Sequence, residues 1–315
     1  MSDIEKKLKR MRDGGYSSAA PTFSPEEERR RRIENLRNII STTTTSSTKL
    51  ICEKPRPVKA PPVAEMISGR TEQVGDLEIF IAGDSYDINH VQGQVRIGDA
   101  FDSDYSKLAH YMRDASLVGF NAQKALYIDT ETTGLAGGSG TMAFMVGAGY
   151  WRDGKFTVDQ YFLRRLEEEP AMLDHLAQLA ENYQYIVSFN GKSFDIPLLN
   201  ARYVMNRRLS PFIGKGHLDL IHPIRRIFRR RLADCTLGNL ECRLLGLERH
   251  NDVPGFEIPG LYFRFLRGVW EDRMGLVFSH NLNDIVSMTA LLPLLTDRLN
   301  DPLNCIEHAA DLYEA

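Results

Sequence analysis

The amino-acid sequence predicts an α/β domain over residues 121–315, with a central sheet flanked by helices. The short apolar runs that predict its strands occupy residues 125–128, 141–146, 156–163 and 185–189. A helical pattern over 168–181 precedes the last of these runs, which gives one strand–helix–strand unit. Beyond that unit the pattern is mostly helical up to Asp311. Strands followed by helices in this order are typical of an α/β domain.

Residues 1–70 predict a basic, disordered arm ahead of the domain. They hold 15 Lys and Arg against 9 Asp and Glu, and 41–48 consists of Ser and Thr alone. Such segments bury too little apolar surface to offset their ordering entropy. We expect one short helix at 25–40, because Ser24 and Glu27 have the spacing of a capping box. That helix is either a solvated part of the arm or a binding site for a protein partner.

Residues 71–120 predict a small β-rich extension between the arm and the domain. The evidence is a set of short apolar runs, of which 77–81 and 94–97 are the clearest. These runs are too mixed in pattern to assign a topology.

The composition excludes several classes of protein. The chain has 315 residues, a formal net charge of −3 and no apolar run of about 18 residues, so we expect no membrane span. Its first residues lack the apolar segment of a secretory signal. Its four cysteines form no C-x-x-C pair, which argues against a disulfide scaffold or a zinc knuckle. A cytoplasmic protein is therefore expected.

Two carboxylates close the predicted strand at 125–128. Side chains alternate faces along a strand, so Asp129 and Glu131 point the same way. Like charges repel unless a cation lies between them or one carboxyl is protonated, and a hard divalent cation takes such oxygen ligands. A solvated strand face is the alternative. The Gly-rich turn that follows favours a site, because active sites of open α/β sheets tend to lie there.

A second polar segment, 189–195, follows the next predicted strand and opens a helix. Its Asp195 would lie in the first helical turn beside the first two carboxylates, unless it only caps that helix. The Gly-Lys-Ser tripeptide at 191–193 is not a phosphate-binding loop, because Ile186 stands where that motif requires its first glycine.

His280 and Asp284 form the third polar element. Four residues apart, they share one face of a predicted helix, and a histidine there can take a proton from water near neutral pH. Together with Asp129, Glu131 and Asp195 they give four carboxylates without a Cys or His cluster, which favours Mg²⁺ or Mn²⁺ over zinc. Two such ions can activate a water and stabilise the leaving oxygen in phosphodiester cleavage.

The three elements resemble the motifs of the DEDD 3′–5′ exonucleases, a branch of the ribonuclease H-like fold. The matching motifs are Asp129-x-Glu131-Thr-x-Gly-Leu135, Asn190-x-x-x-Phe194-Asp195 and His280-x-x-x-Asp284. The chain is still more similar to the predicted YprB-like exonuclease family, through residues 128–141, 189–195, 217–223 and 252–255. The resemblance covers residues 125–295 and implies a ribonuclease H-like fold with a mixed sheet.

The resemblance also implies a role for each matching residue. Asp129, Glu131 and Asp284 would hold the first of two metal ions. Asp129 and Asp195 would bind the second, and His280 would be the general base. The residues expected to contact the nucleic acid are Thr132, Gly134, Leu135, Asn190 and Lys192. One departure concerns His280, which has the three-residue spacing of Tyr-type enzymes instead of the usual four, and this bears on how it approaches the water.

A basic segment between the second and third elements predicts a contact with nucleic acid. Residues 200–250 hold 11 Lys and Arg against 4 Asp and Glu, and clustered basic residues bind phosphates. The run 225–231 has the alternative of being a solvated helix face. Within the same segment, Asp219 is either an auxiliary carboxylate of the site or a structural hydrogen-bonding group.

The sequence therefore predicts a hydrolase that removes nucleotides from a nucleic-acid 3′ end with two Mg²⁺ or Mn²⁺ ions. A non-catalytic nucleic-acid-binding module on the same fold is one alternative, and a structure-specific endonuclease is another. The motifs do not distinguish DNA from RNA or single from double strands.

Overall fold

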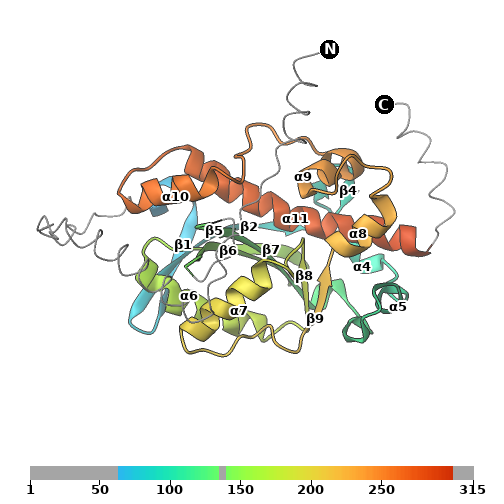
Figure 1. Ribbon diagram of the computed structural model, residues 1–315, viewed down its shortest axis with the longest axis horizontal. Coiled ribbons are helices and arrows are strands. Elements are labelled where there is room, and N and C mark those ends of the chain that lie inside the picture. The colour runs from blue at the N-terminus through green and yellow to red at the C-terminus, as the bar shows by residue number, and fades with distance from the viewer. Residues whose placement is uncertain (1–62, 135–139, 301–315) are drawn as a thin grey trace, which may run out of the picture. The chain divides into compact units, whose positions relative to one another are not determined.

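A computed structural model describes residues 63–134 and 140–300, which belong to one compact unit at 57–315. The core of this unit is a seven-stranded sheet of order β1-β2-β7-β6-β5-β8-β9 (Figure 1). Its strands are β1 (Gly69–Val74), β2 (Leu77–Asp87), β5 (Ala125–Thr132), β6 (Ala143–Arg152), β7 (Lys155–Phe162), β8 (Tyr185–Ser188) and β9 (Gly216–Asp219). Strands β5, β8 and β9 are parallel, and the remaining pairs are antiparallel. The predicted α/β fold with a mixed central sheet is confirmed.

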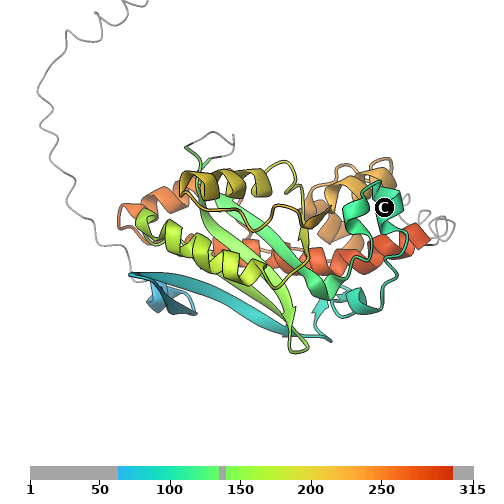
Figure 2. The same cartoon turned by 90° about the horizontal axis from the view of Figure 1, so that it is seen from below.

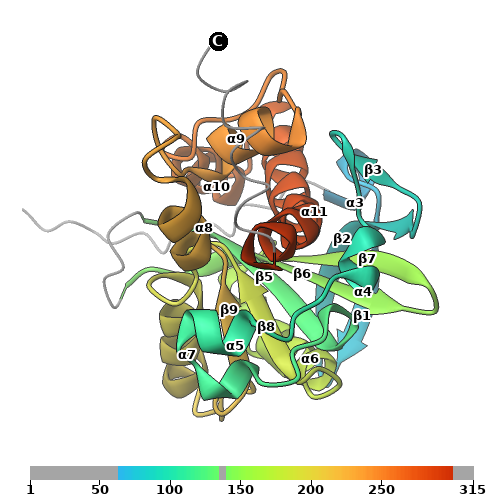
Figure 3. The same cartoon turned by 90° about the vertical axis from the view of Figure 1, so that its right-hand side faces the viewer.

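Helices cover both faces of the sheet. The long helix α11 (Arg273–Asn300) crosses one face, and α6 (Glu169–Ala180) and α7 (Asp195–Met205) lie on the opposite face (Figures 1 and 3). In Figure 2, α6 and α7 lie in front of the strands on that face of the sheet. The shorter helices are α3 (Val63–Met66), α4 (Asp99–Asp102), α5 (Leu108–Met112), α8 (Ile221–Phe228), α9 (Leu237–Leu240) and α10 (Ile258–Leu266). A small hairpin, β3 (Val91–Gln92) with β4 (Val95–Arg96), stands apart from the main sheet.

The centre of the sheet is apolar because both of its faces are covered. The first four residues of β5 are completely buried, although alternate side chains point to opposite faces. On β6, Gly147 allows α11 to lie very close to the sheet. A Cβ added there would be 2.2 Å from Cδ1 of Ile285 and 2.3 Å from Oδ1 of Asn281. Small residues on β6 therefore bring the polar residues of α11 down to the sheet.

The parallel strands end at one edge of the sheet. Val187 pairs with Tyr127 and Ser188 pairs with Asp219, so the carboxyl ends of β5, β8 and β9 are nearly level. The residues that continue past this level are Asp129 to Thr132 on β5 and the loop 189–194 after β8. The fold thus places the first two predicted polar elements side by side.

The predicted strands at 125–128, 141–146, 156–163 and 185–189 are confirmed as β5, β6, β7 and β8, and the predicted helix at 168–181 is confirmed as α6. Within 71–120, β2 pairs along β7, so β1 and β2 extend the main sheet, and α4 and α5 follow the β3–β4 hairpin. The domain boundaries remain predictions. The proposed helix at 25–40 lies outside the described residues, as does nearly all of the proposed arm.

Among the helices that the structure describes, none is both long and apolar enough to cross a membrane.

Candidate active site

Strand β5 carries Asp129 and Glu131 to the edge where the parallel strands end. Burial raises the pKa of Asp129 well above its usual range, and the charges of Asp284 and Asp195 raise it further. The side chain of Asn281 opposes this shift, because its Nδ2 donates to Oδ2 of Asp129 at 2.8 Å. Burial and the neighbouring Asp129 and Asp284 likewise raise the pKa of Glu131. The predicted carboxylates therefore lie close enough to repel one another.

Asp195 is the first residue of α7 and is buried. Oγ1 of Thr130 donates to its Oδ1 at 2.5 Å. Since Thr130 lies between Asp129 and Glu131 on β5, this bond ties the start of α7 to the strand that carries the first two carboxylates. Burial raises the pKa of Asp195 to about 6, although the bond from Thr130 opposes the shift.

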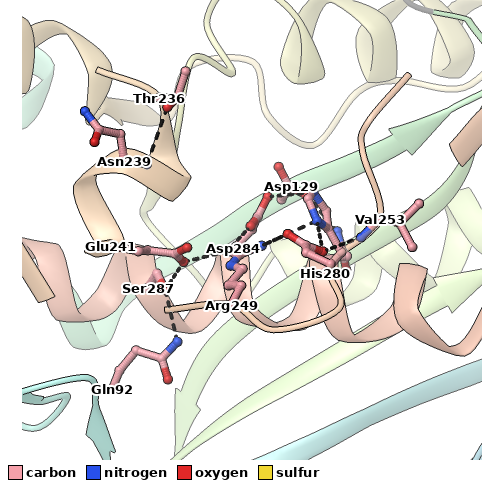
Figure 4. A network of polar contacts seen from close by, with 12 residues as sticks. Gln92, Asp129, Thr236, Asn239, Glu241, Arg249, Val253, His280, Asp284 and Ser287 are labelled. Carbon is pink, nitrogen blue, oxygen red and sulfur yellow. Dashed lines mark hydrogen bonds and ion pairs between the residues drawn. The ribbon is translucent and has the colours of Figure 1, made fainter. Parts of the chain in front are cut away.

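His280 on α11 lies between two carboxylates. Its Nδ1 is 2.8 Å from Oδ1 of Asp252. Its Nε2 is 3.6 Å from Oδ2 of Asp284 (Figure 4). Burial opposes ionisation of Asp252, but the bond with His280 leaves the pKa of Asp252 below its usual value. Nη1 of Arg249 also lies 3.4 Å from Nδ1 of His280, but the contact with Asp252 is much shorter. Because an ionised carboxylate only accepts hydrogen bonds, this shorter contact assigns the hydrogen to Nδ1. When the ring is neutral, Nε2 is then the nitrogen that can accept a proton.

Arg249 supplies a positive charge inside the site. Its Nη2 donates to Oε1 of Glu241 at 2.5 Å and also to Oδ1 of Asp284 (Figure 4). Its Nη1 is 3.4 Å from Oδ2 of Asp252. Burial opposes the charge, but Asp284 and Glu241 raise the pKa of Arg249 above its usual value. The guanidinium therefore stays protonated and neutralises part of the carboxylate cluster.

A chain of hydrogen bonds leads from Arg249 to the β3–β4 hairpin. Oγ of Ser287 donates to Oε1 of Glu241 at 2.5 Å, and Nε2 of Gln92 donates to Oγ of Ser287 at 3.0 Å (Figure 4). Glu241, Ser287 and Gln92 are all buried. The hairpin is thereby connected to Asp284 through a chain of side chains that are buried or nearly so.

The loop after β8 is held in place by Asp219, which is completely buried. Its Oδ1 accepts from the backbone N–H groups of Asn190 at 2.7 Å and Ile221 at 3.2 Å, and its Oδ2 accepts from the N–H of Lys192 at 2.9 Å. Asp219 therefore has the structural role that was one of its two predicted roles. The Nζ of Lys192 is 3.2 Å from Oδ2 of Asp114, so its side chain turns toward that carboxylate.

The residues after Glu131 show the turn that leads away from β5. Oγ1 of Thr132 donates to the carbonyl of Gly134 at 2.9 Å, which closes the turn locally. Leu135, the residue expected to wedge between bases, lies outside the described residues.

Several polar partners of the site were missed by sequence reasoning. Asn281 had a detectable signal, because it adjoins His280 and precedes Asp284 by three residues, which puts it on the face of Asp284. Arg249 belonged to the basic segment, and Asp252 to a stretch that carried the resemblance, but nothing in the spacing connected either residue to His280 or to Asp284.

Comparison with known proteins places this geometry in a family. A family model described as RNase_H superfamily matches residues 126–296, which is more than half of the chain. The chain belongs to the RNase_H superfamily. The matched region contains β5, α7 and the part of α11 that carries His280 and Asp284. Members of this superfamily generally hydrolyse phosphodiester bonds.

The chain is also similar to a curated protein, the uncharacterized protein YprB of Bacillus subtilis (strain 168). It is 33% identical over 187 residues, which cover 59% of this chain and 44% of that protein. The chain thus spans less than half the length of this relative. The predicted YprB-like, ribonuclease H-like membership is confirmed. A solved family B DNA polymerase from the archaeon Pyrobaculum calidifontis aligns with a TM-score of 0.43 and 16% identity, covering 54% of this chain and 24% of that one.

The donor set fits a divalent cation of the kind that RNase_H superfamily nucleases typically use. The candidate donors are carboxylate oxygens. Burial, and after it the repulsion between the carboxylates, raises the pKa values of Asp129 and Glu131, and a bound cation would relieve that repulsion. Among residues 63–134 and 140–300, no group of three or more Asp, Glu, His or Cys side chains has the arrangement of a metal-binding site. Arg249 is the cation that contacts Asp284 in this arrangement.

Proposed function

We propose that the chain is a metal-dependent 3′–5′ exonuclease that hydrolyses terminal phosphodiester bonds of nucleic acid with two Mg²⁺ or Mn²⁺ ions. Asp129, Glu131, Asp195 and Asp284 would hold these ions. The observation that supports the proposal is that carboxylates from β5, α7 and α11, far apart in sequence, act on one another electrostatically at one edge of the sheet. A surface that only binds phosphate gains nothing from such a cluster.

The chain's own residues would handle the proton of the attacking water. Bound metal ions would supply Lewis acidity and lower the pKa of that water. Asp252 would keep the hydrogen of His280 on Nδ1, at 2.8 Å, so that Nε2 faces the site as the general base. Asn281 would hold one oxygen of Asp129 in a single orientation through its 2.8 Å hydrogen bond.

Substrate contacts are proposed at the rim of the same edge. Thr132 and Gly134 would present backbone groups to the terminal nucleotide, and Leu135 would separate the last bases. Asn190 and Lys192 would contact the phosphates from the loop that Asp219 supports. For this contact, Lys192 must give up its ion pair with Asp114 for one with a phosphate.

The cytoplasmic location and a protein partner for residues 1–70 also remain predictions.

One observation favours a non-catalytic nucleic-acid-binding module as the second candidate. The guanidinium of Arg249 forms an ion pair with Oδ1 of Asp284. This ion pair reduces the capacity of the Asp284 carboxylate to bind a metal ion. If Arg249 stays there in the presence of Mn²⁺, the fold would bind nucleic acid without cleaving it.

The test is digestion of DNA and RNA oligonucleotides labelled at either end, with Mg²⁺ or Mn²⁺. A 3′-labelled strand should release labelled mononucleotide at once, and a 5′-labelled strand should give a ladder that shortens with time. Asp129→Ala and Asp284→Ala should each lower the rate by about 10²-fold or more, because several kcal/mol of charge stabilisation are lost.

The matched control is Glu181→Ala, which removes an exposed carboxylate outside the cluster and should leave the rate unchanged. Unimpaired digestion by Asp129→Ala or Asp284→Ala would refute the assignment. Internal fragments from a circular single strand would favour the endonuclease instead.

A further inference from the structure

A hollow lined almost entirely by arginine lies at the end of α8. Its volume is about 430 Å³, and its lining residues are Arg225, Arg226, Ile227, Arg229, Arg230 and Arg231. All five arginines are exposed. Helix α8 begins two residues after Asp219, at the edge of the sheet where the carboxylates lie. The eight residues of α8 correspond to about 12 Å of helix, so an oligonucleotide is long enough to extend from the carboxylates to the hollow.

These arginines differ from Arg202 and Arg208 because no acidic residue among the described residues pairs with them. Arg202 pairs with Glu169 and Arg208 pairs with Asp174, each at 2.5 Å. Within the described part of the chain, no carboxylate forms an ion pair with any arginine of the hollow. Five guanidinium groups that repel one another around one hollow indicate a site for an anion with several charges.

One of the five is already held in place. Arg226 donates from Nη1 to the carbonyl of Tyr111 at 2.5 Å, and its guanidinium lies 5.4 Å from the centre of that ring. Arg226 thus anchors the wall of the hollow against α5. Among the described residues, none accepts a hydrogen bond from the guanidinium groups of the other four arginines, and a guanidinium matches the geometry of phosphate oxygens.

We propose that this hollow binds the phosphate backbone of a single nucleic-acid strand at nucleotides upstream of the end that is cleaved. The inference rests on the proposed function and specifies where the uncleaved part of the substrate strand binds. A chain of phosphates satisfies several arginines at once, whereas one phosphate satisfies only one or two. The lining offers no exposed aromatic ring for stacking, since the ring of Tyr111 is covered by Arg226, so binding is independent of base sequence.

The experiment measures binding of a fluorescent single-stranded oligonucleotide as a function of salt, with a chelator present so that no cleavage occurs. In the double variant Arg229→Gln/Arg230→Gln, two phosphate contacts are lost. The slope of log K against log salt should become shallower by about 1.4, because each contact on a single strand contributes about 0.7. Affinity at low salt should fall at least tenfold, equally for strands of different sequence.

The matched control is Arg152→Gln/Arg267→Gln, which removes the same charge from exposed positions away from the hollow. It should leave the slope unchanged. Equal slopes for the two double variants would overturn the inference. So would an arginine-dependent binding of vesicles containing phosphatidylserine without an effect on the oligonucleotide, because the hollow would then contact lipid headgroups.

Cleavage assays separate this inference from the proposed function. If the wild-type chain digests oligonucleotides and Arg229→Gln/Arg230→Gln binds them normally, the hollow is excluded and the exonuclease stands. If arginine-dependent binding is found without digestion, the hollow stands and the exonuclease fails. When both hold, the double variant should slow digestion of long strands and leave that of a dinucleotide unchanged, since a dinucleotide cannot reach the hollow.

Discussion

Arg249 is the residue on which the charge balance of the site depends. Its guanidinium contacts Glu241 and Asp284, and it is mostly buried, with 12% of its side chain exposed. Glu241 has no exposed surface at all, and its Oε2 has no hydrogen-bond partner among the described residues. A buried carboxylate in this position is tolerated only because a cation is adjacent.

Replacing this cation should destabilise the fold. Arg249→Met is expected to lower the free energy of unfolding by about 3–5 kcal/mol, the usual effect of removing one partner of a buried ion pair. Urea denaturation measures the change. The double variant Arg249→Met/Glu241→Gln should recover most of the loss, because it leaves no unpaired charge beside Ser287. A single variant as stable as Arg267→Met, an exposed control, would contradict the expected role.

At the scale of residues, the sequence predicts which side chains lie together only when they belong to the same helix or strand. Asp129 with Glu131 and His280 with Asp284 are periodic along a strand and a helix, so their shared faces could be predicted. The bond from Arg249 to Asp284 joins residues that are 35 positions apart, and that from Asn281 to Asp129 joins residues 152 apart. No local spacing encodes such contacts, because they exist only after the sheet and α11 have packed.

At the scale of elements, the close approach of α11 to β6 determines whether the site is assembled. Asn281 is completely buried, and besides its bond to Asp129 its Oδ1 accepts from Nε2 of Gln160 at 3.0 Å. Gly147 leaves the space in which that amide lies. The position of α11 relative to β5 therefore depends on Gly147, a residue without a side chain.

Gly147→Ala tests this dependence. The added methyl would collide with Ile285 and Asn281, so we expect a loss of about 1–3 kcal/mol in the free energy of unfolding, as in an overpacked core. If the exonuclease proposal holds, digestion should fall as well. Gly238→Ala is the matched control, because nothing lies within 4 Å of its added Cβ, and Ala is favoured over Gly in a helix. Equal stabilities of the two variants would show that α11 can shift without cost.

The elements themselves were largely predictable where the strands are buried on both sides. Continuous apolar runs marked β5 and β8, and helical periodicity marked α6. The pairing of β2 with β7 was not predictable, because their residues are about 75 positions apart and four other strands, β3 to β6, lie between them in the sequence. For the same reason the runs near 77–81 suggested a separate extension.

At the scale of the whole molecule, the ionised carboxylates that would bind metal ions should destabilise the metal-free fold. Burial, Asp284 and Asp195 raise the pKa of Asp129 in the folded chain above its value in the unfolded chain. The unfolded chain therefore loses its proton first as the pH rises, and the metal-free protein should become less stable above about pH 4. A divalent cation should reverse this loss by binding the ionised carboxylates.

Metal addition and removal test this prediction. With a chelator at pH 7, Asp129→Asn should be more stable than the wild type by about 1 kcal/mol or more, since one pKa unit corresponds to 1.36 kcal/mol. Saturating Mn²⁺ should raise the stability of the wild type by about 2.7 kcal/mol at 100 times Kd, and that of Asp129→Asn by much less. Thermal unfolding with and without Mn²⁺ measures both effects. Equal stabilisation of the two proteins would place the ion elsewhere.

The length of α11 has a consequence for how the site can be lost. His280, Asn281 and Asp284 lie in the interior of a 28-residue helix whose later turns, from Ile285 to Leu295, belong to the hydrophobic core. Fraying at either end of the helix does not reach them. Backbone amides around Asp284 should therefore exchange hydrogen with solvent only when the entire sheet comes apart, and a protease should find no form of the domain that has lost its site alone.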